Sequence, residues 1–150
     1  MTERIDFYVL SSASARQRLA LGCRLAERAY LQDLKVLIAA DSDAEARELD
    51  ELLWTFADRS FVPHHCCGET ECAEPDLPVH VRVRLEPVRG ADLLVNLAAR
   101  LPPQLEVFQR IAEVIDADPE RRRLGRERFK AYRELKLALE THQLGDGAEP

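Results

Sequence analysis

A basic helix near the C-terminus carries the residues best suited to chemistry in this chain. At 100° per residue, side chains separated by four, three and four positions share one narrow stripe: Arg122, Arg126, Phe129 and Arg133. A guanidinium group can hold a carboxylate through two charge-assisted hydrogen bonds, and an adjacent ring can pack against an apolar group of the same ligand. The opposite helix face carries apolar residues expected to enter the core: Leu124, Ala131, Tyr132, Leu135 and Leu139. The stripe therefore predicts a docking surface with Phe129 pointing outward.

Charge is unevenly distributed around this helix. The chain has a formal net charge of −6 over 150 residues. Residues 121–136 nevertheless hold eight basic side chains and two acidic ones, so the segment is locally +6 and the rest of the chain is strongly acidic. An acidic body with one basic patch favours a localised anionic ligand over broad nucleic-acid binding. The alternative interpretation is a solvated basic helix face without a ligand.

The composition indicates one globular domain. A hydrophobic content of 46% in 150 residues is sufficient for a single core, which we expect over residues 1–144, followed by a frayed tail at 145–150. The first apolar segment is too short for a signal peptide or a membrane span, so we expect a cytoplasmic protein that does not cross a membrane. Four cysteines in such a chain are expected to be free thiols.

Apolar runs alternate with helical patterns along the chain. Buried strands are expected at 5–10 and 35–40 with a helix at 13–31 between them, which is a βαβ unit. Further helices are expected at 42–54 and from residue 118 onward, and the latter can extend past Lys136. Further strands are expected at 92–97 and 110–115, and at 79–85, where apolar and polar residues alternate as in a strand with one solvent-exposed face. Residues 63–78 are expected to be loop. This order predicts an α/β fold: a single-domain, Rossmann-like, three-layer, doubly wound arrangement with a mostly parallel sheet.

The turn after the first strand does not favour a nucleotide. It contains Ser11, Ser12 and Ser14 but no glycine, whereas phosphate binding there requires glycines that let backbone N–H groups approach the ligand. The serines are better interpreted as helix N-caps. The chain also lacks a Walker lysine motif, a nucleophile elbow and a His-Glu-x-x-His motif, so we expect neither catalysis nor a bound cofactor.

One cluster could hold a metal. His64, Cys67 and Cys72 offer zinc ligands, but their spacing lacks a clear fourth partner and a second Cys-x-x-Cys pair. Free thiols on a surface loop are the favoured interpretation, and a metal-binding role through this loop remains an alternative.

Trp54, Phe61 and Pro63 form a second apolar constellation at the end of a helix. Large rings in such a position often close the edge of a core. Trp and Phe are also common anchors of protein interfaces. The sequence alone leaves both interpretations open.

Four segments, taken in order, resemble the chi subunit of bacterial DNA polymerase III holoenzyme. They are residues 49–54 (LDELLW), 60–64 (SFVPH), 126–133 (RERFKAYR) and 140–142 (ETH), and the similarity covers nearly the whole chain. The chain departs from the family in carrying Phe129 where members have tyrosine. It also has a cysteine-rich, acidic segment between Cys66 and Pro78.

The resemblance implies a non-catalytic adaptor with a Rossmann-like fold that binds no nucleotide. In this family one surface binds the psi subunit of the clamp loader, and another binds the acidic C-terminal tail of single-stranded-DNA-binding protein. The motifs imply a psi-binding surface at Trp54, Phe61, Pro63 and His64. They imply a tail site at Arg122, Arg126, Phe129, Lys130 and Arg133. The alternative for this basic helix is a nucleic-acid-binding module without sequence-specific recognition, in which Phe129 stacks on a base.

Overall fold

The computed structural model describes residues 2–55, 63–68, 78–83, 91–102 and 107–144. Its strands are β1 (Arg4–Leu10), β2 (Val36–Ala39), β3 (His64–Gly68), β4 (Val79–Arg82), β5 (Leu93–Asn96), β6 (Arg110–Ile115) and β7 (Leu139–Leu144). They form one parallel sheet in the order β3-β4-β2-β5-β6-β1-β7. From β1 the chain crosses to the half of the sheet that contains β2, β3 and β4, and it then returns through β5 and β6 toward β1. The last strand, β7, lies at the edge of the sheet on the other side of β1. The doubly wound α/β prediction is confirmed.

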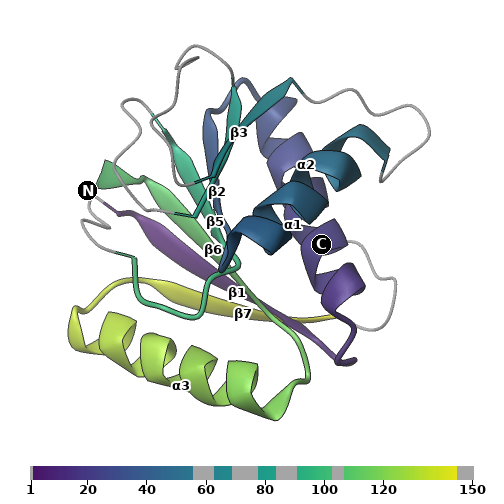
Figure 1. The fold of residues 1–150 in the computed structure, drawn as a ribbon. Coiled ribbons are helices and arrows are strands. Elements are labelled where there is room, and N and C mark those ends of the chain that lie inside the picture. Colours follow the sequence, from purple (N-terminus) through teal and green to yellow (C-terminus); the bar gives the residue numbers. More distant parts are fainter. Residues whose placement is uncertain (1, 56–62, 69–77, 84–90, 103–106, 145–150) are drawn as a thin grey trace.

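In the part of the chain that the structure describes, three helices cover the two faces of the sheet: α1 (Ala15–Tyr30), α2 (Asp43–Thr55) and α3 (Pro119–Glu134). Figure 1 shows α1 and α2 on one side and α3 on the other, next to β7 and β1. This gives the three predicted layers. Over the described ranges, none of the helices combines the length and the apolar character needed to cross a bilayer.

Polar caps determine where the helices begin. The Ser14 side chain accepts a hydrogen bond from the backbone N–H of Gln17, so this serine caps α1 as predicted. The Ser42 hydroxyl accepts from the N–H of Glu45 at the start of α2. Asp118 caps α3 in the same way, and Pro119 occupies its first turn, where its missing N–H costs no hydrogen bond.

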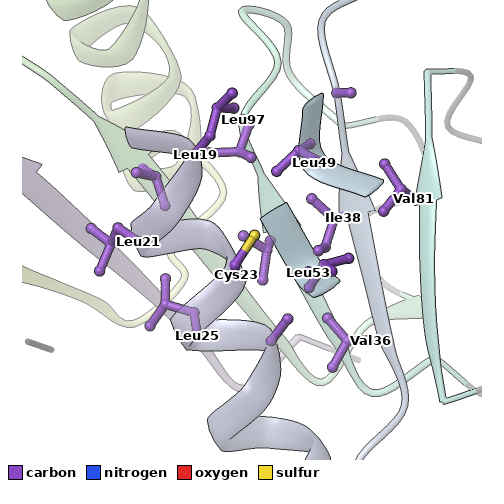
Figure 2. Close-up of a cluster of buried hydrophobic side chains, with 14 of the residues drawn as sticks. Leu19, Leu21, Cys23, Leu25, Val36, Ile38, Leu49, Leu53, Val81 and Leu97 are labelled. Carbon is purple, nitrogen blue, oxygen red and sulfur yellow. The ribbon is translucent and has the colours of Figure 1, made fainter. Parts of the chain in front are cut away.

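The larger core lies between the sheet and the α1–α2 pair (Figure 2). Parallel strands buried on both faces are rich in apolar residues, which is why the sequence predicts β1, β2 and β6. β2 is wholly apolar, whereas β1 and β6 each contain one buried acidic residue, Asp6 and Glu113. Side chains no more than 2% exposed in this core include Leu19, Cys23, Val36, Ile38, Leu49 and Leu53.

A second core lies between the sheet and α3. Phe7 of β1, Ile111 of β6 and Tyr132 of α3 are buried in it. Successive side chains of a strand point to opposite faces, so β1 contributes Phe7 to this core and Leu10 to the larger one. This second core supports the candidate site described below.

The C-terminal element differs from the sequence-based expectation. We expected the last helix to continue past Lys136, but α3 ends at Glu134 and β7 follows, parallel to β1. The N–H of Lys136 bonds to the carbonyl of Arg133, and that of Leu137 bonds to the carbonyl of Tyr132. Lys136 itself has a φ of 59°. These two hydrogen bonds form a Schellman motif, in which the left-handed residue is usually glycine, so a lysine at this position did not indicate the end of α3.

Two expectations elsewhere were also wrong. Part of the expected loop at 63–78 forms β3, which pairs with β4. The strand at 79–85 was expected to have one wet face, yet His80 is only 2% exposed. The alternating pattern misled because β4 lies inside the sheet, between β3 and β2, and its first three residues are all buried.

Candidate docking site

A buried carboxylate fixes α3 to the sheet. Glu113 of β6 is fully buried and accepts hydrogen bonds from Tyr132 Oη at 2.6 Å and Arg128 Nε at 3.1 Å. Asn96 Nδ2 of β5 donates to the same carboxylate at 3.0 Å. Burial raises the pKa of Glu113, whereas these three donors favour its ionised form. The network sets the rotation of α3, with Arg128 and Tyr132 facing the sheet.

Gly125 allows α3 to approach β6 closely. A Cβ atom at this position would lie 2.3 Å from Cδ1 of Ile115 and 3.1 Å from its Cγ1. Such a separation is far shorter than a van der Waals contact, so only glycine fits without a shift of the side chain or the helix. The Ile115 side chain therefore occupies the space that a larger residue at position 125 would need.

Gly125 and Ile115 also line a pocket between α3 and the strands β1 and β7. Its volume is about 240 Å³, with apolar walls and arginine at its rim. β7 forms one side of the pocket because its odd-numbered residues face α3. The lining residues are Phe7, Val9, Ile115, Arg122, Gly125, Arg126, Phe129, Thr141 and Gln143. Three members of the predicted stripe therefore line one concave surface.

The orientation of Phe129 corrects the sequence-based prediction. We expected this ring to point outward without a core to enter, but it is half-buried and packs edge-on against Phe7, with ring centroids 5.1 Å apart. The prediction failed because Phe7 comes from a distant strand that the helical pattern does not reveal. The ring is thus a wall of the pocket and not a free stacking surface.

The two lining arginines have different roles. Arg122 is partly buried, and it donates from Nε to the carbonyl of Asp116 and from Nη2 to the carbonyl of Leu10, at 3.2 and 3.3 Å. Arg126 is exposed and makes no hydrogen bond or ion pair with any residue of the described ranges. Arg126 is therefore available to an incoming anion, while Arg122 is held at the rim by backbone carbonyls.

Lys130 and Arg133 are exposed on α3, outside the set of residues that line the pocket. They add positive charge near the pocket without lining the concave surface.

The opposite face of α3 is only partly as expected. Tyr132 is buried, Leu124 is half-buried, and Leu135 is 55% exposed because the helix ends just before it.

Several basic residues of this segment have internal partners. Arg121 holds Asp116 through two hydrogen bonds of 2.8 and 2.6 Å. Arg123 pairs with Glu120 and Glu127 along the helix. With Arg128 bound to Glu113 in the core, the charge presented around the pocket is smaller than the local +6 of the sequence suggests.

The other predicted surface is described only in part. Trp54 ends α2 with 53% of its surface exposed, and Pro63 is half-buried. Phe61 lies outside the described residues, and so does the side chain of His64, whose backbone begins β3. Trp54 is therefore not enclosed in the core.

The predicted metal candidates cannot be placed together. Cys67 contributes backbone to β3, but its side chain and the whole of Cys72 lie outside the described residues. A different group, Asp6, Glu140 and His142, has ligand atoms within 4.8 Å of one another. Asp6 already pairs with Arg4 at 2.9 Å, and this guanidinium charge opposes a cation there.

Internal polar contacts line the crevice where a Rossmann-like sheet would bind a nucleotide. At the carboxyl ends of the strands, Arg18 is 3% exposed, pairs with Glu45, and donates to the carbonyl of Leu97 at 2.8 Å. Asp41 accepts from the N–H of Ala99 in the same region. These side chains bind one another where nucleotide-binding folds present glycines.

Comparison with known proteins identifies the family. The profile described as "DNA polymerase III chi subunit, HolC" matches residues 1–140. The chain belongs to the DNA polymerase III chi-subunit family. The "DNA polymerase III subunit chi" of Pseudomonas aeruginosa is 36% identical over 141 residues, covering 94% of this chain and 96% of that protein. The proteins of the same name from Haemophilus influenzae and Escherichia coli are 30% and 28% identical, and cover 97% and 90% of this chain and 100% and 94% of theirs.

Membership of the chi family makes this chain a non-catalytic accessory subunit, as the resemblance implied. A more remote likeness concerns the fold alone. "The crystal structure of T4 UvsW" superposes with a TM-score of 0.67 at 8% identity, and the match covers 96% of this chain and 42% of that one.

Sequence reasoning missed part of the concave surface. Thr141 and Gln143 were not predicted as site residues, because β7 was expected to be helix and loop. Their alternation along an edge strand, with both side chains on the α3 face, was the available signal.

Proposed function

We propose that this chi-family protein is a replication adaptor that links the clamp loader, through psi, to the C-terminal tail of single-stranded-DNA-binding protein. The observation that carries the proposal is the apolar pocket with Arg126 at its rim. A peptide that ends in an apolar or aromatic residue and a free carboxylate presents the complementary chemistry.

The pocket suggests how such a tail would bind. The terminal side chain would enter between Phe129 and β7, where the walls are apolar. Arg126 would hold the terminal carboxylate or a nearby acidic side chain, with Arg122 as a second charge. Lys130 and Arg133 would attract the acidic part of the tail during approach. Because only a few residues are engaged, we expect micromolar affinity for one tail, increased by avidity on an oligomeric partner.

Trp54 supports the psi-binding half of the proposal. This residue is 53% exposed near the end of α2, which lies on the opposite side of the sheet from α3 (Figure 1). Two separate surfaces would allow psi and the tail to bind at the same time. Trp54→Ala should weaken binding of psi at least about tenfold and leave tail binding unchanged. Unchanged psi affinity would exclude Trp54 from that interface.

Calorimetry with a synthetic tail peptide tests the other half. The peptide is copied from the C-terminus of the single-stranded-DNA-binding protein encoded in the same genome. Removal of its last residue should abolish measurable binding, and C-terminal amidation should weaken it by removing the negative charge. Equal affinity of the intact, the shortened and the amidated peptide would reject the tail model. A single-stranded oligonucleotide binding more tightly than the peptide at physiological salt would favour the nucleic-acid alternative.

A further inference from the structure

The strand β7 has one open edge. Among the described strands it pairs with β1 on one side and with none on the other. The backbone of such an edge presents N–H and C=O groups that can pair with another extended segment. The other outer strand, β3, lies at the opposite end of the sheet, so only β7 borders the proposed tail site on α3 (Figure 1).

The register of β7 against β1 shows which of its backbone groups face outward. In a parallel pair, alternate residues of a strand bond to the neighbouring strand. The N–H of Ile5 bonds to the carbonyl of Ala138. At the other end, the N–H of Ser11 bonds to the carbonyl of Leu144, so the even-numbered residues of β7 bond to β1. The backbone groups of the odd-numbered residues point away from the sheet, and no residue of the described ranges is hydrogen-bonded to them. These residues are Leu139, Thr141 and Gln143.

The open edge is continuous with the pocket under α3. Thr141 and Gln143 line that pocket together with Phe129 and Arg126, and both are exposed. An extended segment paired with the edge of β7 would therefore lie beside the pocket, with every second side chain directed toward the α3 face. One of these side chains can enter the pocket while the backbone of the segment bonds to β7.

Positive charge on α3 follows this edge. Arg126 and Arg133 share the helix stripe of Phe129 and are exposed, and no residue of the described ranges forms a hydrogen bond or ion pair with either. Lys130 is also exposed, but Glu134 one turn later can offset its charge. The two arginines are therefore the groups that favour an acidic segment along β7.

The other acidic side chains next to this edge already have basic partners. Glu127 of α3 pairs with Arg123 at 3.0 Å. Glu140 of β7 is even-numbered, so its side chain faces the other side of the sheet, where it pairs with Arg4 at 3.3 Å. Neither carboxylate lies between the two free arginines and the edge of β7.

The course of α3 determines the direction of a bound segment. The helix connects the parallel strands β6 and β7, so it runs antiparallel to both. Phe129 packs against Phe7, which pairs with Thr141 in the middle of β7. Arg126 precedes Phe129 and lies toward the end of β7, whereas Arg133 follows it and lies toward the start. A segment with its carboxyl end at Arg126 and its acidic part near Arg133 therefore runs parallel to β7.

We propose that the partner tail binds as an added strand, parallel to β7, with its backbone paired to the odd-numbered residues of β7 and its last side chain in the pocket. This inference rests on the adaptor role proposed above and specifies how the tail is held. In such strand additions main-chain hydrogen bonds supply affinity, and pockets for alternate side chains supply specificity. β7 has six residues, which limits the paired segment to about that length.

A scan of backbone N-methylation along the tail peptide tests the inference. Each methyl group removes one N–H donor and keeps the side chain. In an added strand only alternate N–H groups bond to β7. Methylation should therefore weaken binding about fivefold at every second position and much less at the positions between them, which are the matched controls. Calorimetry measures the series, and a loss of affinity without alternation would overturn the proposal.

Amide hydrogen exchange of the full chain, followed by nuclear magnetic resonance, locates the contact on the protein. Saturating tail peptide should slow exchange of the N–H groups of Thr141 and Gln143. Those of Glu140 and His142, which bond to β1, should change little. Protection of Thr141 and Gln143 without peptide, increasing with protein concentration, would assign the edge to a second copy of the chain and overturn the proposal.

Two substitutions at Thr141 separate the backbone from the side chain. Thr141→Pro removes the outward N–H, which an edge strand can lose without breaking its pairing to β1. Thr141→Ala removes the same side chain and keeps the N–H. The proline variant should bind the tail about fivefold more weakly than the alanine variant. Equal affinities would overturn the proposal, and the methylation scan decides if the proline variant does not fold.

The adaptor role and the added strand fail in different ways. Absence of tail binding to the unmodified chain would reject both. Tail binding that responds neither to alternate backbone methylation nor to Thr141→Pro would keep the tail site and reject the added strand alone.

Discussion

Phe129 of α3 and Phe7 of β1 meet edge to face, with ring centroids 5.1 Å apart and planes inclined at 66°. Phe7 is 2% exposed and belongs to the core beneath α3. One side of the Phe129 ring is therefore anchored on the core while the other lines the proposed tail site. At this position folding and binding depend on the same side chain.

Phe129→Ala should lower both the free energy of unfolding and the affinity for the tail peptide. The variant loses the contact with Phe7 and one wall of the pocket, and we expect about 1.5 kcal/mol less stability, the lower end for burial of a large apolar side chain. Urea denaturation and calorimetry measure the two effects. Phe129→Tyr is the matched control because it keeps the ring. A stable Phe129→Ala variant with full affinity would contradict the assigned role.

Gly125→Ala should destabilise the chain through a clash with Ile115. Alanine favours a helix over glycine by about 1 kcal/mol, but overpacking costs about 1 to 3 kcal/mol. We expect net destabilisation and weaker tail binding, because the new methyl group enters the pocket. Adding Ile115→Val removes the Cδ1 atom that lies 2.3 Å from the new Cβ. The double variant should recover stability relative to Gly125→Ala alone, and additive losses would argue against this clash.

Much of the fold follows from local patterns. The buried strands are mostly apolar, and Ser14, Ser42 and Asp118 cap helices where their spacing predicts. These features require only neighbouring residues, so the sequence displays them. The stripe on α3 was found in the same way, because helical spacing alone brings Arg122, Arg126 and Phe129 together.

The rest depends on contacts between distant segments. Lys136 takes a left-handed conformation that sequence patterns associate with glycine, so the end of α3 and the start of β7 were missed. Without β7 the concave shape of the site could not be predicted. The burial of Phe129 likewise depends on Phe7, which precedes it by most of the chain. Linear spacing identifies which side chains share a helix face, but not what that face meets.

Glu113→Gln should strongly destabilise the protein. The amide cannot carry the charge that pairs with Arg128, and it leaves a guanidinium buried without its counterion. Breaking a buried ion pair on one side costs about 3 to 5 kcal/mol. Thermal or urea unfolding measures this loss. Glu127→Gln, on the exposed face of α3, should produce no measurable change. Similar stability of both variants would remove Glu113 from its central structural role.

The stability contributed by Asp6 should depend on pH. Burial alone would raise the pKa of Asp6, but hydrogen bonds from Arg4, His142 and Arg110 outweigh burial and lower it. A carboxyl with a lowered folded-state pKa stabilises the fold above its unfolded pKa of about 3.9, and this stability disappears as pH falls through the folded value. The stability advantage of wild type over Asp6→Asn should therefore be complete at about pH 6 and shrink below about pH 4. Urea titrations at several pH values measure it, and a constant difference would contradict the shift.

Two arginines on α3 allow the electrostatic part of tail binding to be isolated. Arg126 lines the pocket rim, whereas Arg123 is engaged with Glu120 and Glu127 on the same helix. Both are exposed, so each alanine variant removes one positive charge at little structural cost. Arg126→Ala should weaken the tail peptide about tenfold, equivalent to about 1.4 kcal/mol. Arg123→Ala should have a much smaller effect, because its charge is already balanced by two carboxylates.

The salt dependence of tail binding, measured for wild type and Arg126→Ala, distinguishes a direct contact of Arg126 with the tail from general electrostatic attraction. Raising the ionic strength screens exposed charges beyond about 10 Å at 0.1 M, so wild-type affinity should fall with added salt. If Arg126 binds the carboxylate directly, its removal should reduce the salt dependence and also leave a deficit in affinity at high salt, since the hydrogen bonds are lost with the charge. Affinities of wild type and Arg126→Ala that converge at high salt would mean that the arginine only attracts the tail, and the contact would have to be assigned to Arg122.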